Sequence, residues 1–111
     1  MSEHRAFAFR SDLTLDDMFA RLQSTGPWAW DRRDSDRWDN YLSACPEPAP
    51  NRVMVKIFVE DVGQYVVDVL FSYRQEDAAA RADYNAARAV LFDRLLPAIG
   101  ARDINPADPR E

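Results

Sequence analysis

Few side chains in this 111-residue chain have the intrinsic reactivity that catalysis requires. Its one cysteine is Cys45 and its one histidine is His4. A catalytic thiolate needs a cationic or histidine neighbour that lowers its pKa, and nothing in the sequence places His4 near Cys45. A zinc site of the usual Cys/His type needs more ligands than these two residues supply. We therefore expect neither thiol catalysis nor a metal site, and a single cysteine excludes an intrachain disulfide.

A cluster of aspartates is the next candidate for chemistry, because carboxylates bind hard metal ions. It lies in WAWDRRDSDRWDNY, residues 28–41, which also holds all three tryptophans. A calcium loop of the EF-hand kind needs a central glycine and a closing glutamate, and this stretch has neither. The interleaved arginines would also repel a cation. The pattern favours a solvated, charge-paired turn.

Two pairs of charged residues complete the candidates. Asp68 is the only acid expected among apolar side chains on a strand, and Lys56 opposite would keep it ionised. A structural ion pair is therefore favoured over acid–base catalysis. Arg81 and Arg88 stand seven residues apart in a predicted helix. Arg88 either extends along the edge of the core or lies in a cleft where an anionic ligand could bind, and we favour the first interpretation.

Composition excludes several other functions. The formal net charge is −5, from 19 acidic and 14 basic residues, which argues against a phosphate-binding nucleic-acid surface. All three glycines are used at turns or helix ends, and no glycine-rich nucleotide motif occurs. No apolar run approaches the ~20 residues that span a bilayer. The charged N-terminus carries no apolar signal core, so we expect a cytoplasmic protein without cofactors.

The elements that must position these residues can be predicted from local signals. Thr14 caps a helix, with Asp17 completing a capping box and Leu13 and Met18 forming a hydrophobic staple. Gly26–Pro27 ends this helix. A second, long helix is expected over residues 76–100, where Pro97 should end or kink it after Leu96 and Gly100 should stop it. Strands are expected at residues 4–10, 28–33, 37–43, 52–60 and 64–74.

The last two strands form the clearest hairpin. Their loop, residues 61–63, ends in a glycine that suits the left-handed conformation. The register that keeps both faces consistent sets Val55 opposite Val69 on one face and Lys56 opposite Asp68 on the other. These elements predict an α+β two-layer sandwich in the order β-α-β-β-β-β-α. A largely antiparallel sheet of about five strands has both helices on one face, residues 1–104 form a single domain, and residues 105–111 form a flexible tail.

Two layers leave the second face of the sheet without helices. On the central hairpin this face carries Met54, Phe58, Val66 and Leu70 around the Lys56–Asp68 pair. So many apolar side chains indicate either an interface or cover by another part of the chain, and the sequence leaves both open. In the tryptophan-rich stretch, Trp28 and Trp30 should point together into the core. Trp38 and Tyr41 fall on opposite faces of their strand, so one of them should be exposed.

Two functional hypotheses from different classes follow. The first is a small acidic interaction module without catalytic activity, such as an inhibitor, an immunity-type protein or an adaptor. It would bind a protein partner, or a second copy as a two-fold homodimer, through Met54, Lys56, Phe58, Val66, Asp68, Leu70, Trp38 and Arg37. The second is a small-molecule-binding protein or enzyme with a pocket between the long helix and the sheet. That pocket would be lined by Trp28, Trp30, Tyr65, Tyr73, Tyr84 and Arg88, although a filled core is the favoured interpretation of these aromatic residues.

Overall fold

The computed structural model describes residues 2–35, 39–44, 53–72 and 78–107. The elements in chain order are β1 (Ser2–Arg10), α1 (Leu15–Thr25), β2 (Trp30–Ser35), β3 (Asp39–Ala44), β4 (Val53–Asp61), β5 (Gln64–Ser72), α2 (Ala78–Val90), the π-helical turn η1 (Leu91–Leu95), α3 (Leu96–Ala98) and β6 (Arg102–Ala107). The predictions for Arg37, Trp38, Cys45 and Tyr73 lie outside the described residues.

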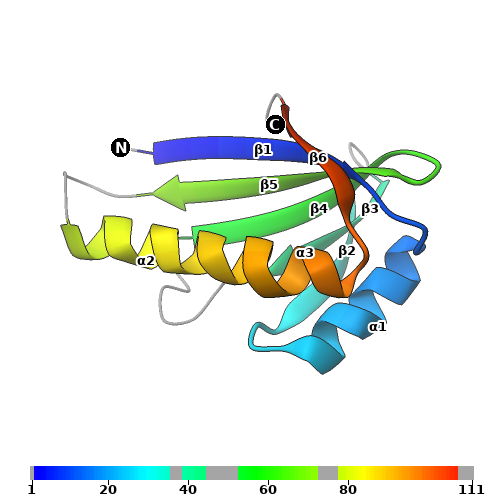
Figure 1. Cartoon of the computed structure of the whole chain (residues 1–111), viewed down its shortest axis with the longest axis horizontal. Coiled ribbons are helices and arrows are strands. Elements are labelled where there is room, and N and C mark those ends of the chain that lie inside the picture. Colours follow the sequence, from blue (N-terminus) through cyan, green and yellow to red (C-terminus); the bar gives the residue numbers. More distant parts are fainter. Residues whose placement is uncertain (1, 36–38, 45–52, 73–77, 108–111) are drawn as a thin grey trace.

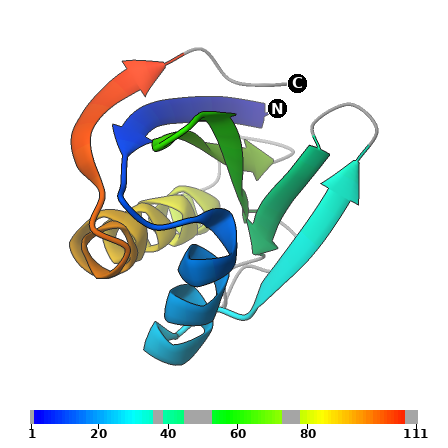
Figure 2. The same cartoon turned by 90° about the vertical axis from the view of Figure 1, so that its right-hand side faces the viewer.

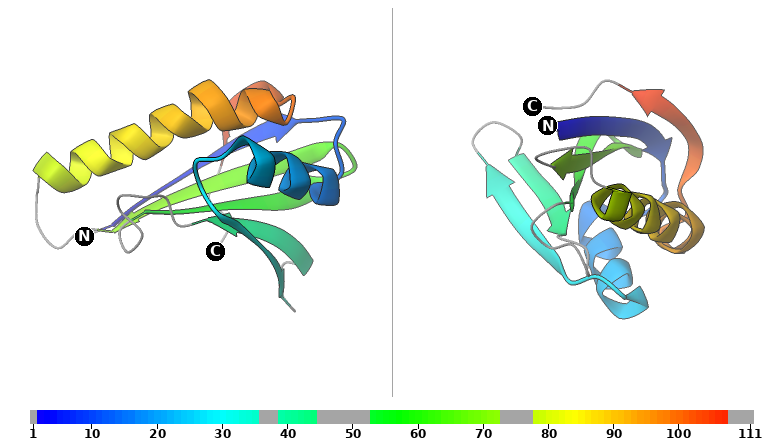
Figure 3. Two further views of the ribbon diagram at one scale, coloured as in Figure 1. Left: turned by 90° about the horizontal axis from the view of Figure 1, so that it is seen from below. Right: turned by 90° about the vertical axis from the view of Figure 1, so that its left-hand side faces the viewer.

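The described strands form one antiparallel sheet of six strands in the order β2-β3-β4-β5-β1-β6. Both helices cover the same face of this sheet (Figures 1 and 2). Helix α1 contacts β2 and β3, α2 contacts β4, and the short α3 contacts α1 (Figure 3). The predicted α+β class with helices on one face is confirmed, and the sheet has one strand more than the sequence indicated.

The central hairpin has the predicted register over most of its length. Val55 lies opposite Val69 and Lys56 lies opposite Asp68. The turn is tighter than the expected three-residue loop, because the register shifts beyond Val59 and Asp61 then pairs with Gln64. Such a bulge adds a residue to one strand and increases the local twist. The turn itself consists of Val62 and Gly63. Gly63 has a φ of 72°, the left-handed conformation that the sequence predicted.

The first helix is capped by Thr14 and ends at Gly26, as its sequence predicts, but among the described residues only the Thr14 half of the expected capping box forms a hydrogen bond. The Oγ1 of Thr14 accepts a hydrogen bond from the backbone N–H of Asp17 at 3.2 Å. Met18 is completely buried and Leu13 packs partly buried against the same core, as expected of a staple. At the other end Gly26 takes a φ of 62° and donates its N–H to the carbonyl of Leu22.

The long helix differs from the prediction at Pro97. It does not end after Leu96 but continues through α3, and its distortion comes earlier, in the π-helical turn Leu91–Leu95. There the N–H of Leu96 donates to the carbonyl of Leu91, five residues back. Proline has no N–H and its ring crowds the carbonyl four residues earlier, so a widened turn accommodates it without a break. The helix then stops at Gly100, which has a φ of 67°.

The chain after Gly100 forms a strand of the sheet that runs three residues into the segment 105–111, which the sequence predicted as a tail. Strand β6 pairs with Ala6–Arg10 of β1 and runs to Ala107, past residue 104, where we expected the folded domain to end. Its side chains are almost all exposed, which is why hydrophobic periodicity could not reveal it. As an edge strand it carries charged residues and Pro106, features that discourage pairing with another chain.

The core lies between the helices and the inner sheet face. Trp28 and Trp30 are both buried there, with ring centroids 6.0 Å apart, so the prediction that they point together into the core is confirmed. The backbone N–H of Trp30 donates to Oε1 of Gln23 at 2.8 Å, which ties β2 to α1. Leu22, Leu42, Ile57, Leu95 and Ile99 are completely buried around them. Each such side chain contributes about 1.5–3 kcal/mol of hydrophobic stabilisation.

Replacing Gly63 by alanine should lower the free energy of unfolding by about 1–2 kcal/mol, because an alanine at this positive φ is strained. Crowding should add little, since a Cβ would meet only the Ser11 carbonyl oxygen, at 3.6 Å. Asparagine tolerates the left-handed region better, so Gly63→Asn should lose less stability than Gly63→Ala. Urea denaturation of the two variants tests this, and equal losses would contradict the backbone explanation.

Candidate functional site

The second sheet face, predicted as an interface, is largely covered. Met54, Lys56, Phe58, Val66, Asp68 and Leu70 do share this face, as the register requires. Phe58 is only 1% exposed, Val66 7% and Asp68 3%, whereas Met54, Lys56 and Leu70 are half-buried. The centre of this face is therefore buried.

Tyr41 supplies part of this cover. It lies opposite Phe58 on the neighbouring strand, and the two rings are 5.2 Å apart between centroids. The ammonium nitrogen of Lys56 lies 5.6 Å from the centroid of the Tyr41 ring, within range of a cation–π contact. Tyr41 is thus half-buried on this face, and the comparison with Trp38 falls outside the described residues.

The predicted ligand pocket between the long helix and the sheet is filled by its own aromatic side chains. Trp28, Trp30, Tyr65 and Tyr84 are each no more than 5% exposed and belong to one hydrophobic core cluster. Arg88 instead lies exposed at the edge of this core, where its guanidinium carbon is 5.3 Å from the Phe7 ring centroid. This is the arrangement we favoured for Arg88.

The structure places a cleft elsewhere, at the end of the molecule where the β4–β5 turn meets the loop between β1 and α1. We call it the hairpin-end cleft. It has a volume of about 680 Å³ and is lined by Ser11, Asp12, Leu13, Thr14, Leu15, Val59, Asp61, Val62, Gly63 and Tyr65. Sequence reasoning missed this site because it treated residues 61–63 only as a turn. The available signal was Val62, an apolar residue where turns favour polar ones.

A buried serine holds the two walls of the cleft together. The N–H of Ser11 donates to the carbonyl of Gly63 at 3.1 Å, and its Oγ accepts from the N–H of Leu13 at 3.2 Å. The same hydroxyl donates to the carbonyl of Ile99 at 2.6 Å, so the end of the long helix joins the junction. Ser11 is 2% exposed, and its hydrogen bonds are therefore shielded from water. We call this set of bonds the Ser11 junction.

Tyr65 forms the inner end of the cleft. Its hydroxyl donates to the carbonyl of Leu13 at 2.6 Å, and its ring stacks on Phe9 with centroids 5.6 Å apart. Burial raises the pKa of the Tyr65 hydroxyl above its ordinary value, because the charged form would lose hydration. The hydroxyl therefore stays protonated at neutral pH and acts as a fixed donor between turn and loop.

Apolar side chains project around this end of the molecule. Val62 is 94% exposed at the tip of the turn, and Val59, which also lines the cleft, is 42% exposed. Ile104 on β6 is 37% exposed, and its neighbours Asp103 and Asn105 line an adjoining hollow with Glu60 and Gln64. Among the residues that the structure describes, these are the only large apolar side chains so exposed.

Carboxylates surround the apolar surface. Asp12 and Asp61 line the cleft, while Glu60 and Asp103 lie in the adjoining hollow. Asp12 accepts a hydrogen bond from Arg102 at 2.9 Å, and this guanidinium holds the pKa of the Asp12 carboxyl below its usual value. Within the described parts of the chain, no group of three or more histidine, cysteine or acidic residues could hold a metal ion.

Two sequence comparisons assign no relative to this chain. The chain matches no protein-family model, and a search of curated protein sequences gave no match either. No helix in the described ranges is long and apolar enough to cross a membrane. The functional inference therefore depends on the geometry of the hairpin-end cleft.

Ser11→Ala should lower the free energy of unfolding by about 1–3 kcal/mol, because the substitution leaves the buried Ile99 carbonyl and Leu13 N–H without their partner. Ser24→Ala is the matched control, since the Ser24 hydroxyl is exposed and bonds only to Arg21 in its own helix. The control should change stability by no more than about 0.5 kcal/mol. Urea denaturation measures both, and similar losses in the two variants would contradict a special role for Ser11.

A double-mutant cycle tests the Lys56–Asp68 pair on the second sheet face. Lys56→Met and Asp68→Asn should each destabilise the protein, because each leaves one charge in a poorly hydrated position. The double variant should be less destabilised than the sum of the two, with a coupling free energy of about 0.5–3 kcal/mol. Additive losses in thermal or urea denaturation would show that the two residues act independently.

Proposed function

We propose that the protein is a small interaction module without catalytic activity, which binds a partner protein at the hairpin-end cleft. The observation that carries this proposal is the 94% exposure of Val62 beside a cleft that Val59 also lines. Single exposed apolar residues are common on protein surfaces, whereas apolar residues gathered around one hollow are typical of a binding surface. The second sheet face offers less exposed apolar surface to a partner, because Phe58 and Val66 are buried.

The charge around the cleft favours a basic partner. Asp12, Glu60, Asp61 and Asp103 bring carboxylates to the rim, and the whole chain has a formal net charge of −5. Arg102 offsets part of this charge through its bond to Asp12, and Arg10, which lines the adjoining hollow, offsets a further part. Complementary charge at a rim speeds association and selects among partners, while apolar contacts at the centre supply affinity. We therefore expect a partner segment with apolar side chains flanked by lysine or arginine.

The walls of the cleft are held in place before any partner binds. The Ser11 junction joins loop to turn, and the Tyr65 hydroxyl joins the turn to Leu13. A preorganised surface loses little conformational entropy on binding, so more of the contact energy appears as affinity. A hollow of about 680 Å³ can receive a few side chains, which suits a short peptide segment or the tip of a loop.

Self-association through the second sheet face stays a separate prediction. Its half-buried apolar residues are Met54 and Leu70, which lie opposite each other on neighbouring strands. Two half-buried side chains expose little apolar surface compared with the interface of a stable dimer, which buries about 800 Å² on each partner.

Selection from a random peptide library displayed on phage would test the proposed interaction. We expect selected peptides to combine leucine, isoleucine or phenylalanine with lysine or arginine. Their amide shift changes in NMR titrations should map to residues 59–65 and 11–15. Val62→Ser should weaken their affinity at least about tenfold, the equivalent of roughly 1.4 kcal/mol, because it removes the exposed anchor without disturbing the core.

Asp93→Asn is the matched control, because Asp93 is an exposed carboxylate on the π-helical turn rather than at the cleft. It should leave affinity unchanged, whereas Asp61→Asn should weaken binding of the basic peptides. Selection of acidic peptides would contradict the proposed partner chemistry. Peptides whose binding is insensitive to Val62→Ser would contradict the site.

A further inference from the structure

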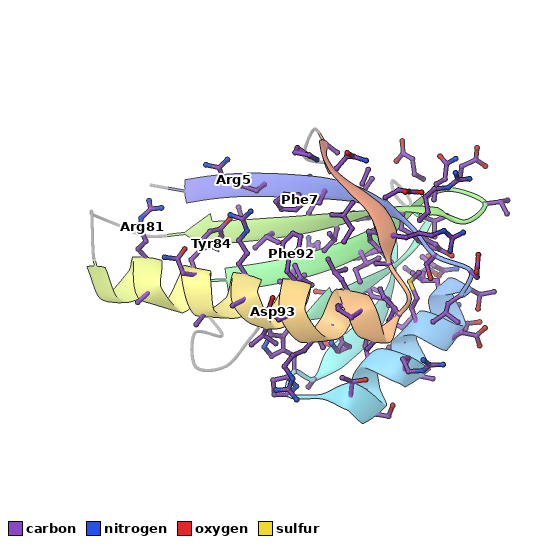
Figure 4. The ribbon with its side chains drawn as sticks, viewed as in Figure 1. Arg5, Phe7, Arg81, Tyr84, Phe92 and Asp93 are labelled. Atoms are coloured by element: carbon purple, nitrogen blue, oxygen red, sulfur yellow. The ribbon has the colours of Figure 1, made fainter. Side chains whose placement is uncertain are left out.

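A second region with recognition chemistry lies where side chains of the long helical segment meet Phe7 of β1. Figure 4 shows Arg5 and Phe7 on the strand and Arg81, Tyr84 and Phe92 on the helical segment facing it. The rings of Phe7 and Phe92 meet edge to face, with centroids 4.9 Å apart at an angle of 88°. This contact gives the edge of the core an ordered aromatic surface.

Arg88 lies against both rings. Its guanidinium carbon is 5.3 Å from the centroid of Phe7 and 5.4 Å from that of Phe92. Contacts with aromatic rings restrict the guanidinium while leaving its N–H groups available at its edge. In the part of the chain that the structure describes, Arg88 is exposed and makes neither a hydrogen bond nor an ion pair. Its donors are therefore directed to solvent from a restricted position.

Arg5 carries a second guanidinium, and it lies on the same strand as Phe7. It precedes Phe7 by two residues, so both side chains leave the same face of β1, about 7 Å apart along the strand. Arg5 is exposed and, like Arg88, has no hydrogen bond or ion pair within the described residues. Within the described residues, β6 pairs with β1 from Ala6 onward. Arg81, seven residues before Arg88, adds positive charge to this side of the molecule.

We propose that Arg88 and Arg5 together bind the dianionic phosphate group of a small molecule, with Phe7 and Phe92 holding Arg88 in place. Two guanidiniums match two negative charges, and the planar N–H fork of arginine suits bidentate bonds to phosphate oxygens. The phosphate is either inorganic or part of a small phosphate monoester. The site is separate from the hairpin-end cleft, so the proposal does not rest on the proposed function.

NMR titration of the arginine Nε–Hε signals tests the proposal in the intact wild-type protein. The probes are inorganic phosphate, phenyl phosphate and acetate, each compared with sodium chloride at equal ionic strength. We expect saturable shifts of the Arg88 and Arg5 signals with phosphate, and at least fivefold weaker binding of the monoanion acetate. Tighter binding of phenyl phosphate than of inorganic phosphate would identify a monoester as the ligand, whereas equal binding would identify the free ion.

Variants add a second measurement. Arg88→Gln and Arg5→Gln should each reduce phosphate affinity at least fivefold, and Arg88→Lys should also weaken it because lysine lacks the planar fork. Arg94→Gln is the matched control, an exposed arginine on the adjoining π-helical turn, and it should leave affinity unchanged. The proposal would be overturned if Arg94 shifted with phosphate as much as Arg88, if acetate bound as well as phosphate, or if Arg88→Gln had no effect.

Discussion

The Ser11 junction is the constraint on which the hairpin end of this molecule depends. Three segments that are distant in sequence meet at one buried residue: the start of α1, the β4–β5 turn and the end of the long helix. Buried polar groups must be paired, because an unpaired one loses its hydration without compensation. The positions of Leu13, Gly63 and Ile99 are therefore linked, and a displacement of one segment would break bonds of the others.

This link explains why an exposed cleft can have a defined shape. Turns and loops are usually the most mobile parts of a fold, since few buried contacts hold them. Here the turn is joined to the loop by the N–H of Ser11 and again by the hydroxyl of Tyr65. Val62 is thus presented at the tip of a restrained turn. Hydrogen bonds inside the fold determine where this apolar side chain meets a partner.

Local signals in the sequence predicted the elements whose boundaries depend on neighbouring residues. The cap at Thr14, the glycine at position 63 and the hairpin register all follow from nearest-neighbour geometry, and each is present. Strand β6 could not be predicted in full, because an exposed edge strand has no apolar alternation and is defined by its pairing with β1. The Ser11 junction could not be predicted for a related reason. Ser11 and Ile99 are 88 residues apart in sequence, so no local signal indicates that they meet.

The distribution of apolar residues gives the proposed interaction its strongest support. Phe58 and Val66 show that this fold can bury apolar side chains even on the sheet face without helices. Val62 occupies a turn, where a polar residue would satisfy the backbone equally well and would favour solubility. Folding alone therefore does not require valine at this position, and an apolar residue exposed there has an unfavourable contact with water. Binding of a partner at the hairpin-end cleft would remove that contact with water. A partner therefore explains the exposed valine at position 62, which the stability of the fold does not explain.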